Sequence, residues 1–219
     1  MGAEYWEGAY SKEPFFYPSY DGWLDKYRAL WENAGNIIDL GCGSGVNSIF
    51  LRGQGVRTIA CDFSGEALAR LKSALPDARR MCFDMSAGLP FDDGFSDLFV
   101  ADLSLHYFTK TDTVGILRDI GRVLSTRGHL LCRVNAVREF AENEKDESVE
   151  TEHHVYKNRK GIKRYFNRAD VDEFFTGWKV LSTAEVVIHK YAGKKYAWEI
   201  CAGNTKRVAC MDTPYSFLD

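Results

Sequence analysis

Residues Ile37–Leu51, with the sequence IIDLGCGSGVNSIFL, contain the pattern that decides the fold. The adjacent β-branched residues Ile37 and Ile38 favour a strand that is buried on both faces. Asp39 follows at the carboxyl end of that strand, where open α/β sheets bind their ligands. From Val46 onward the hydrophobic spacing becomes that of a helix. The stretch therefore predicts a strand, a turn and a helix, with a carboxylate at the end of the strand.

Three alternating glycines, Gly41, Gly43 and Gly45, make up the predicted turn. A residue without Cβ lets the main chain turn sharply and lets a ligand lie against it. The dinucleotide-binding pattern G-x-G-x-x-G requires a glycine at the position of Val46, whereas here the third glycine comes one residue earlier. The order D-x-G-x-G-x-G therefore departs from the nicotinamide pattern. A sharp structural turn that binds nothing is the alternative interpretation.

Composition indicates one α/β domain with a full core, because the chain has 219 residues of which 45% are hydrophobic. A net charge of −3 argues against binding to nucleic acid as the main function. No apolar run reaches membrane-spanning length and the first residues lack a signal-peptide pattern, so we expect a cytoplasmic protein without a membrane partner. The six cysteines include no C-x-x-C pair, which leaves a zinc site of that kind unsupported.

Two further carboxylates follow predicted strands. Asp62 comes after the strand Val56–Cys61, where nucleotide binders place an acid that accepts hydrogen bonds from both ribose hydroxyls. An acid that stabilises the start of the next helix is the alternative. Asp84 lies at the tip of a short third strand, Arg80–Met85, and its alternative role is that of a turn residue.

The glycine motif, these acids and the stretch LPFDDGFSDLFVADLSLHYF at residues 89–108 together resemble class I S-adenosylmethionine (SAM)-dependent methyltransferases of the small-molecule type. The resemblance implies an α/β, Rossmann-like, doubly wound fold. Its seven-stranded sheet is mostly parallel, has helices on both faces and ends in an antiparallel hairpin. The β-rich runs Lys179–Lys190 and Lys195–Ala202 predict such a hairpin.

The resemblance also implies the ligand, SAM, with S-adenosylhomocysteine as product. In this family the glycine turn approaches the methionine part, and the acid at Asp39 helps to hold the amino group. Asp62 then corresponds to the ribose-binding acid, and Asp84 with the N–H of Met85 to the adenine-binding pair. The candidate cofactor-binding residues are Asp39, Gly41, Cys42, Gly43, Gly45, Asp62, Phe63, Ser64, Asp84, Met85, Leu103, Trp6 and Tyr10.

The chain is predicted to have three parts. Residues 1–35 form an aromatic N-terminal segment, which either closes over the ligand as a lid or covers an edge of the core. Residues 36–203 form the SAM-binding domain, with an acceptor-site insertion at about 138–166, and residues 204–219 form a tail. Within the insertion, His153 and His154 are adjacent, but no third ligand lies nearby in the sequence, so no metal site is predicted. The residues of the insertion that could touch a substrate are His153, His154, Tyr156, Arg159, Tyr165 and Phe166.

The implied reaction is transfer of the methyl group of SAM to a small-molecule acceptor by in-line displacement. His106 is the candidate general base, because the unperturbed pKa of histidine lies near neutral, and a residue that shapes the pocket or caps a helix is the alternative. A SAM-binding protein without catalysis, or a nicotinamide-dependent oxidoreductase, are the other functions considered. We expect a monomer or homodimer that binds no nucleic acid.

Overall fold

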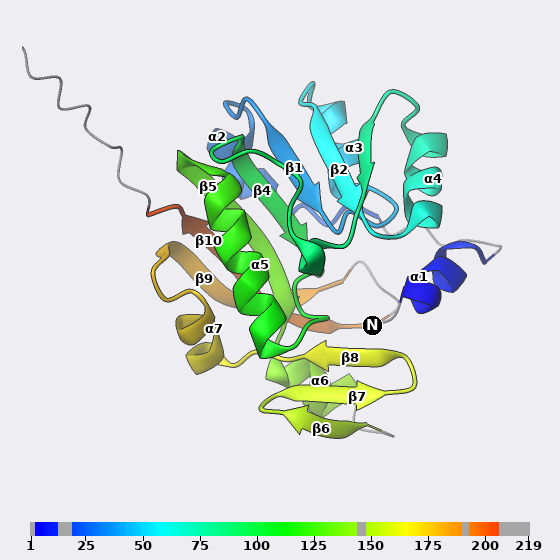
Figure 1. Cartoon of the computed structure of the whole chain (residues 1–219), viewed down its shortest axis with the longest axis vertical. Helices are drawn as coiled ribbons and strands as arrows, with labels where there is room; N and C mark the ends of the chain where they lie inside the picture. The colour runs from blue at the N-terminus through cyan, green and yellow to red at the C-terminus, as the bar shows by residue number, and fades with distance from the viewer. Residues whose placement is uncertain (1–2, 13–18, 144–147, 190–192, 206–219) are drawn as a thin grey trace, which may run out of the picture.

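A seven-stranded sheet forms the centre of the molecule, with the strand order β3-β2-β1-β4-β5-β10-β9 (Figure 1). The computed structural model describes residues 3–12, 19–143, 148–189 and 193–205. The strands of this sheet are β1 (Ile37–Leu40), β2 (Thr58–Asp62), β3 (Arg79–Cys82), β4 (Ser96–Asp102), β5 (Leu124–Asn135), β9 (Lys179–Ile188) and β10 (Lys195–Gly203). β1 pairs in parallel with β2 and β4, whereas β10 runs antiparallel to both β5 and β9. The predicted mostly parallel sheet with an antiparallel hairpin is therefore confirmed.

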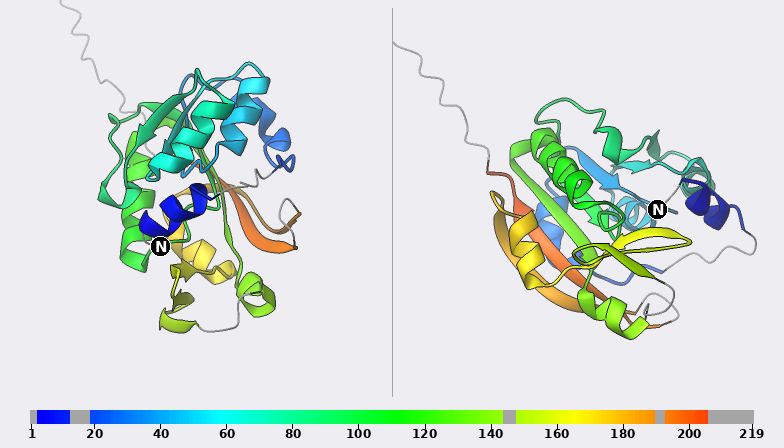
Figure 2. Two further views of the ribbon diagram at one scale, coloured as in Figure 1. Left: turned by 90° about the vertical axis from the view of Figure 1, so that its right-hand side faces the viewer. Right: turned by 60° about the horizontal axis from the view of Figure 1, so that its bottom comes forward.

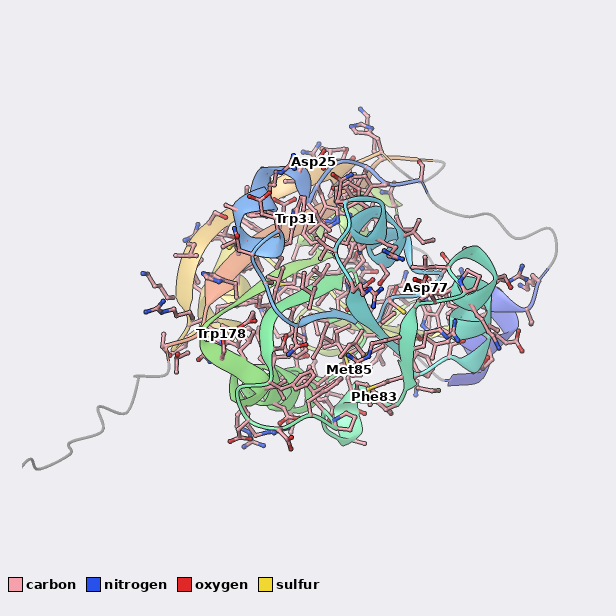
Figure 3. All side chains as sticks on the ribbon, turned by 90° about the horizontal axis from the view of Figure 1, so that it is seen from above. Asp25, Trp31, Asp77, Phe83, Met85 and Trp178 are labelled. Atoms are coloured by element: carbon pink, nitrogen blue, oxygen red, sulfur yellow. The ribbon has the colours of Figure 1, made fainter. Side chains whose placement is uncertain are left out.

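Helices cover both faces of the sheet. They are α1 (Ala3–Tyr10), α2 (Arg28–Trp31), α3 (Val46–Gly53), α4 (Gly65–Ala74), α5 (Lys110–Val123), α6 (Val137–Asn143) and α7 (Arg168–Phe174), with 3-10 turns η1 (Asp25–Tyr27) and η2 (Met85–Ala87). On one face Trp31 and Leu51 pack against Val100, and on the other α5 and α7 pack against Phe99. Figure 3 shows Trp31 and Met85 on opposite sides of the sheet, in agreement with the two core clusters.

The predicted insertion forms a structure of its own beyond the carboxyl ends of the parallel strands (Figures 1 and 2). It contains α6 and a three-stranded antiparallel sheet of β6 (Val149–Glu152), β7 (Val155–Asn158) and β8 (Gly161–Arg164). Within the insertion, the buried Arg164 pairs with the exposed Glu152, with 2.9 Å between Nη2 and Oε2. The end of β8 is joined to the main body, because the N–H of Arg164 donates to the carbonyl of His106 at 2.7 Å.

The apolar stripe at residues 21–34 predicts one long helix, and this prediction is wrong. Only a 3-10 turn and the four-residue helix α2 form there. Gly22 has φ +80°, outside the helical region. The hydroxyl of Tyr20 accepts from the N–H of Leu24 at 3.0 Å and donates to Asp25 at 2.9 Å. These contacts hold the start of the segment in a non-helical conformation.

Among the described residues, no helix combines the length and apolar character needed to cross a membrane. The five described cysteines are free thiols, and Cys42, Cys61, Cys132 and Cys201 are buried. The predicted tail lies outside the described residues beyond Thr205.

Candidate functional site

A cavity of about 650 Å³ opens at the carboxyl ends of β1, β2 and β4, beneath α1 and beside α6. This volume lies within the range of sites that enclose small organic ligands. Ten of the candidate cofactor-binding residues line it: Trp6, Tyr10, Gly41, Cys42, Gly43, Asp62, Phe63, Asp84, Met85 and Leu103. Asp39, Gly45 and Ser64, together with the candidate base His106, are not among its lining residues.

The glycine turn needs glycine for two separate reasons. Gly41, Gly43 and Gly45 have φ values of +70°, +54° and +86°, a region that residues with a Cβ rarely adopt. Their surroundings also leave no room for a Cβ. One added at Gly41 would lie 2.3 Å from the Cβ of Ser104, and one at Gly45 would lie 2.4 Å from Leu71 Cδ1. Gly41 and Gly43 therefore let the main chain line the cavity, and Gly45 lets α3 pack against α4.

Asp62, at the end of β2, fixes the shape of this turn. Its Oδ2 accepts from the N–H of Gly43 at 2.8 Å, and its Oδ1 accepts from the N–H of Ser64 at 2.9 Å. The side chain is buried, and burial raises its pKa from the ordinary value while these N–H donors lower it. Each carboxylate oxygen can accept a second hydrogen bond, so Asp62 can still bind hydroxyl groups from the cavity. Ser64, a candidate cofactor-binding residue, caps α4, because its Oγ accepts from the N–H of Ala67.

Asp39 lies beneath the turn. Its Oδ2 accepts from both the N–H and the hydroxyl of Ser48, at 3.1 and 2.7 Å, which ties β1 to α3. Its Oδ1 is buried and has no hydrogen-bond partner among the described residues. Burial, the largest effect, raises the pKa of Asp39 to about 7, since a carboxylate is poorly solvated there.

Asp84 and Met85 lie just beyond β3, which ends at Cys82 rather than at Met85 as predicted. Asp84 is the N-cap of η2, and its Oδ1 accepts from the N–H and the hydroxyl of Ser86 at 2.8 and 2.7 Å. Both Asp84 and Met85 line the cavity. The turn role and a binding role are therefore compatible, because the cap holds the carboxylate in place.

The end of β4 carries the strongest polar network of the site. Leu103 has φ +58°, which is unusual for a residue with a Cβ, and its N–H donates to the carbonyl of Arg133. The buried guanidinium of Arg133 donates to both oxygens of Asp102, at 2.8 and 2.9 Å, and to Asp21 at 2.7 Å. It also lies 4.6 Å from the ring centroid of Trp23. These contacts hold Asp102 and Leu103 at the cavity wall.

Helix α1 brings an aromatic cluster to the cavity. The ring of Trp6 packs against Tyr10 and, edge to face, against Tyr107, with centroid distances of 5.7 and 5.5 Å. Glu7 fastens this helix to α4, because its carboxylate accepts from the N–H groups of Gly65 and Glu66 at 2.7 and 3.1 Å. Acceptors at a helix N-terminus satisfy backbone donors that have no partner within the helix.

His106 lies fully buried behind the cavity. Neither ring nitrogen has a hydrogen-bond partner among the described residues. Burial, helped by the charges of Lys195 and Lys163, holds the pKa of this imidazole well below its usual value. A neutral and weakly basic ring, away from the lining, favours the pocket-shaping role over that of a general base.

Several residues line the cavity although the sequence patterns did not predict them as site residues, among them Asn47, Tyr107, Glu139, Asn143 and Lys195. Asn47 lies two residues after Gly45, and its place in the first turn of the predicted helix was the available signal. Glu139 reaches the cavity from α6, where its Oε2 accepts from the N–H of Tyr196 at 2.8 Å and from Asn143 Nδ2 at 3.0 Å. None of the six insertion residues expected to touch a substrate is among the lining residues.

Comparison with known proteins agrees with this arrangement. Residues 38–132 match the sequence model of the methyltransferase domain family. The methyltransferase YqeM of Bacillus subtilis is 32% identical over 127 residues, which cover 56% of this chain and 51% of that protein. The chain spans about half the length of the relatives it matches in sequence.

Solved structures share the fold. A SAM-dependent methyltransferase from Methanosarcina mazei has a TM-score of 0.68 at 18% identity, over 84% of this chain and 99% of that one. The 1,6-didemethyltoxoflavin-N1-methyltransferase of Burkholderia thailandensis, solved with that compound and S-adenosylhomocysteine, has a TM-score of 0.63 at 17% identity, over 83% of this chain and 76% of that one. The strand order, the glycine turn and the match over residues 38–132 make this chain similar to class I SAM-dependent methyltransferases.

Proposed function

We propose that this chain transfers the methyl group of SAM to a small-molecule acceptor. One observation carries the proposal. The glycine turn and the acids that follow β2 and β3 line a single cavity, at the edge of the sheet where class I SAM-dependent methyltransferases bind SAM. That the Burkholderia relative in fold was solved with bound 1,6-didemethyltoxoflavin supports a small-molecule acceptor.

The residues of the cavity suit the parts of SAM. Asp62 offers carboxylate oxygens to the ribose hydroxyls, and Asp84 with Met85 would hold the adenine. The bare main chain at Gly41 and Gly43 would receive the methionine part, next to Asn47 and Leu103. Asp39 supports the turn from below, and we propose that it acts on the amino group through the turn rather than by contact.

The acceptor would enter from the side of α1 and α6. Trp6 and Tyr107 offer aromatic faces there, whereas Glu139, Asn143 and Lys195 offer polar groups. Lys195 Nζ lies 3.6 Å from Glu139 Oε1, so this wall carries both charges in close proximity. An acceptor with an apolar ring and a polar substituent fits such a lining.

The sulfonium of SAM supplies an already activated methyl group, so the protein mainly has to align donor and acceptor and exclude water. Helix α1 covers the cavity and would exclude water, and the rigid end of β4 would align the reactants. We propose that a thiol, amine or other acceptor that needs no strong base is favoured, because His106 is buried and weakly basic.

Titration calorimetry of the purified chain with SAM, S-adenosylhomocysteine and NAD tests the binding step. We expect one molecule of SAM or S-adenosylhomocysteine per chain and no NAD binding. A second assay follows label from methyl-tritiated SAM into a panel of small heterocycles, thiols and amines. Binding of NAD without SAM would overturn the proposal. SAM binding with no methylation of any compound, including acceptors from cell extract, would instead indicate a non-catalytic SAM-binding protein.

A further inference from the structure

Two adjacent histidines of the insertion, His153 and His154, lie beside the carboxylate of Asp170 from α7. Their candidate ligand atoms all lie within 4.8 Å of one another. We propose that these three side chains form a binding site for a divalent transition-metal ion, with Zn²⁺ as the best match. The proposal does not depend on the proposed methyl transfer, because none of the three residues lines the cavity.

The hairpin between β6 and β7 brings the two imidazoles together. His153 and His154 are the two residues of its turn, and successive residues of a strand would point to opposite faces. His154 instead adopts φ +58°, one of only two described non-glycine residues with positive φ. The rings consequently stack, with centroids 3.8 Å apart and an interplanar angle of 30°. The turn therefore presents two imidazoles on the same side.

Asp170 completes the cluster, and it is held rigidly. It is the third residue of α7, in a capping box with Asn167: its backbone N–H donates to Asn167 Oδ1, and its Oδ2 accepts from the Asn167 N–H at 2.8 Å. Its side chain is only 7% exposed. A carboxylate ligand that is fixed by other hydrogen bonds is typical of metal sites, because a held ligand needs little reorganisation.

The two nitrogen–oxygen distances lie on either side of the spacing between zinc ligands. His154 Nδ1 lies 2.7 Å from Asp170 Oδ2, and His153 Nε2 lies 3.7 Å from Asp170 Oδ1. Ligands at about 2.0–2.1 Å from a tetrahedral Zn²⁺ lie roughly 3.3 Å from one another, between these two values. Imidazole nitrogen and carboxylate oxygen are ligands that Zn²⁺ accepts. A metal bound to Nδ1 would replace the hydrogen bond between His154 and Asp170, and the neutral imidazole would carry its proton on Nε2.

The surroundings favour a cation and leave one side open. Glu150 Oε1 accepts from the N–H of His154 at 2.8 Å, and Glu152 offsets the positive charge of the buried Arg164. The side chain of His153 is 74% exposed, so water can complete the coordination. A bound metal would connect the β6–β7 turn to α7 and so fix the insertion against the main body.

The test is calorimetric titration of the full chain with Zn²⁺, after removal of any histidine tag and of bound metal. We expect one Zn²⁺ per chain, binding about tenfold or more weaker in His153→Ala, and unchanged binding in His189→Ala. His189 is an exposed histidine just after β9 and is the matched control. Because His153 is exposed, its replacement leaves the core intact, and circular dichroism verifies the fold.

Replacement of Zn²⁺ by Co²⁺ provides a second readout, because the visible spectrum of Co²⁺ reports its ligands. We expect a change in that spectrum in the wild-type and His189→Ala chains, and a much weaker one in His153→Ala and Asp170→Asn. Two results would overturn the proposal: no stoichiometric binding of Zn²⁺ by the wild-type chain, or equal binding by wild type and His153→Ala.

Discussion

Asp39 and Asp62 lie on neighbouring parallel strands, yet each is stabilised differently. Asp62 receives N–H donors at both oxygens, whereas Asp39 receives donors at one oxygen and buries the other without a partner among the described residues. A buried carboxylate with few donors is costly to ionise. We therefore predict that Asp39 supports the fold in its neutral form and that Asp62 interacts as a carboxylate.

The raised pKa of Asp39 makes the free energy of unfolding depend on pH. Unfolded aspartate loses its proton near 3.8, whereas folded Asp39 keeps it to about 7. Between these values the folded state binds more protons than the unfolded state, so this residue makes stability fall as pH rises. The slope contributed by one full proton is about 1.4 kcal/mol per pH unit. Urea unfolding of wild type and Asp39→Asn between pH 5 and 7 should show that the wild type loses stability relative to the variant as pH rises. Parallel curves would contradict the burial argument.

Gly43 offers a matched comparison with Gly55. Both have positive φ, so alanine at either position should cost about 1–2 kcal/mol of stability. A Cβ at Gly43 would lie 2.5 Å from the Tyr10 hydroxyl and would project into the cavity, whereas one at Gly55 meets open space. We expect Gly43→Ala to weaken SAM binding about tenfold or more and Gly55→Ala to leave it unchanged, as measured by calorimetry. Equal affinities for SAM in the two variants would show that the glycine turn is not part of the ligand site.

At the scale of elements, the described contacts between α1 and the body include polar ones near its surface, which suits a segment that opens for ligand exchange. Glu7 bonds the start of α4, and the Arg70 guanidinium donates to the carbonyls of Tyr10 and Lys12 at 2.9 and 3.1 Å. Trp6 contributes the contact with Tyr107 across the cavity. These contacts support the lid interpretation of the N-terminal segment, which remains a proposal.

Glu7→Ala tests this interpretation. Loss of the two hydrogen bonds at the start of α4 should destabilise the closed conformation by about 1 kcal/mol relative to the open one. SAM should then be released about fivefold faster. Stopped-flow fluorescence can follow release, because Trp6 lies in the same helix. Glu66→Ala, a change at an exposed acid in the first turn of α4, is the control and should release SAM at the wild-type rate. An unchanged rate in Glu7→Ala would show that α1 does not gate the cavity.

Elements that follow from local pattern were predictable, and those set by distant contacts were not. The β-branched pair at Ile37, the Ser64 cap and the Asn167 capping box all follow from short-range chemistry. The helix expected over residues 21–34 fails in part because Asp21 pairs with Arg133, which is far away in the sequence and outside any local periodicity. The sheet of the insertion was likewise missed, since its short strands alternate weakly between polar and apolar residues.

At the scale of the molecule, the strand order brings residues far apart in sequence to one edge. The order β3-β2-β1-β4 gathers Asp84, Asp62 and Asp102, and the insertion adds Glu139 from the opposite side. The first two were predictable because acids at the ends of parallel strands share an edge. The ion pair of Arg133 with Asp21 and the contact of Asp170 with His154 could not be predicted. Each joins two segments that no sequence pattern links.

The most direct test of the account is the affinity of S-adenosylhomocysteine for wild type and Asp62→Asn, measured by calorimetry under the same conditions. Asparagine keeps the size of the side chain but offers one acceptor oxygen instead of two, so the turn and the ribose must compete for it. We predict a loss of about 1–3 kcal/mol, roughly five- to 150-fold in Kd, with the fold retained by circular dichroism. Equal affinity in the two proteins would contradict the claim that the nucleoside lies across the ends of β1, β2 and β3.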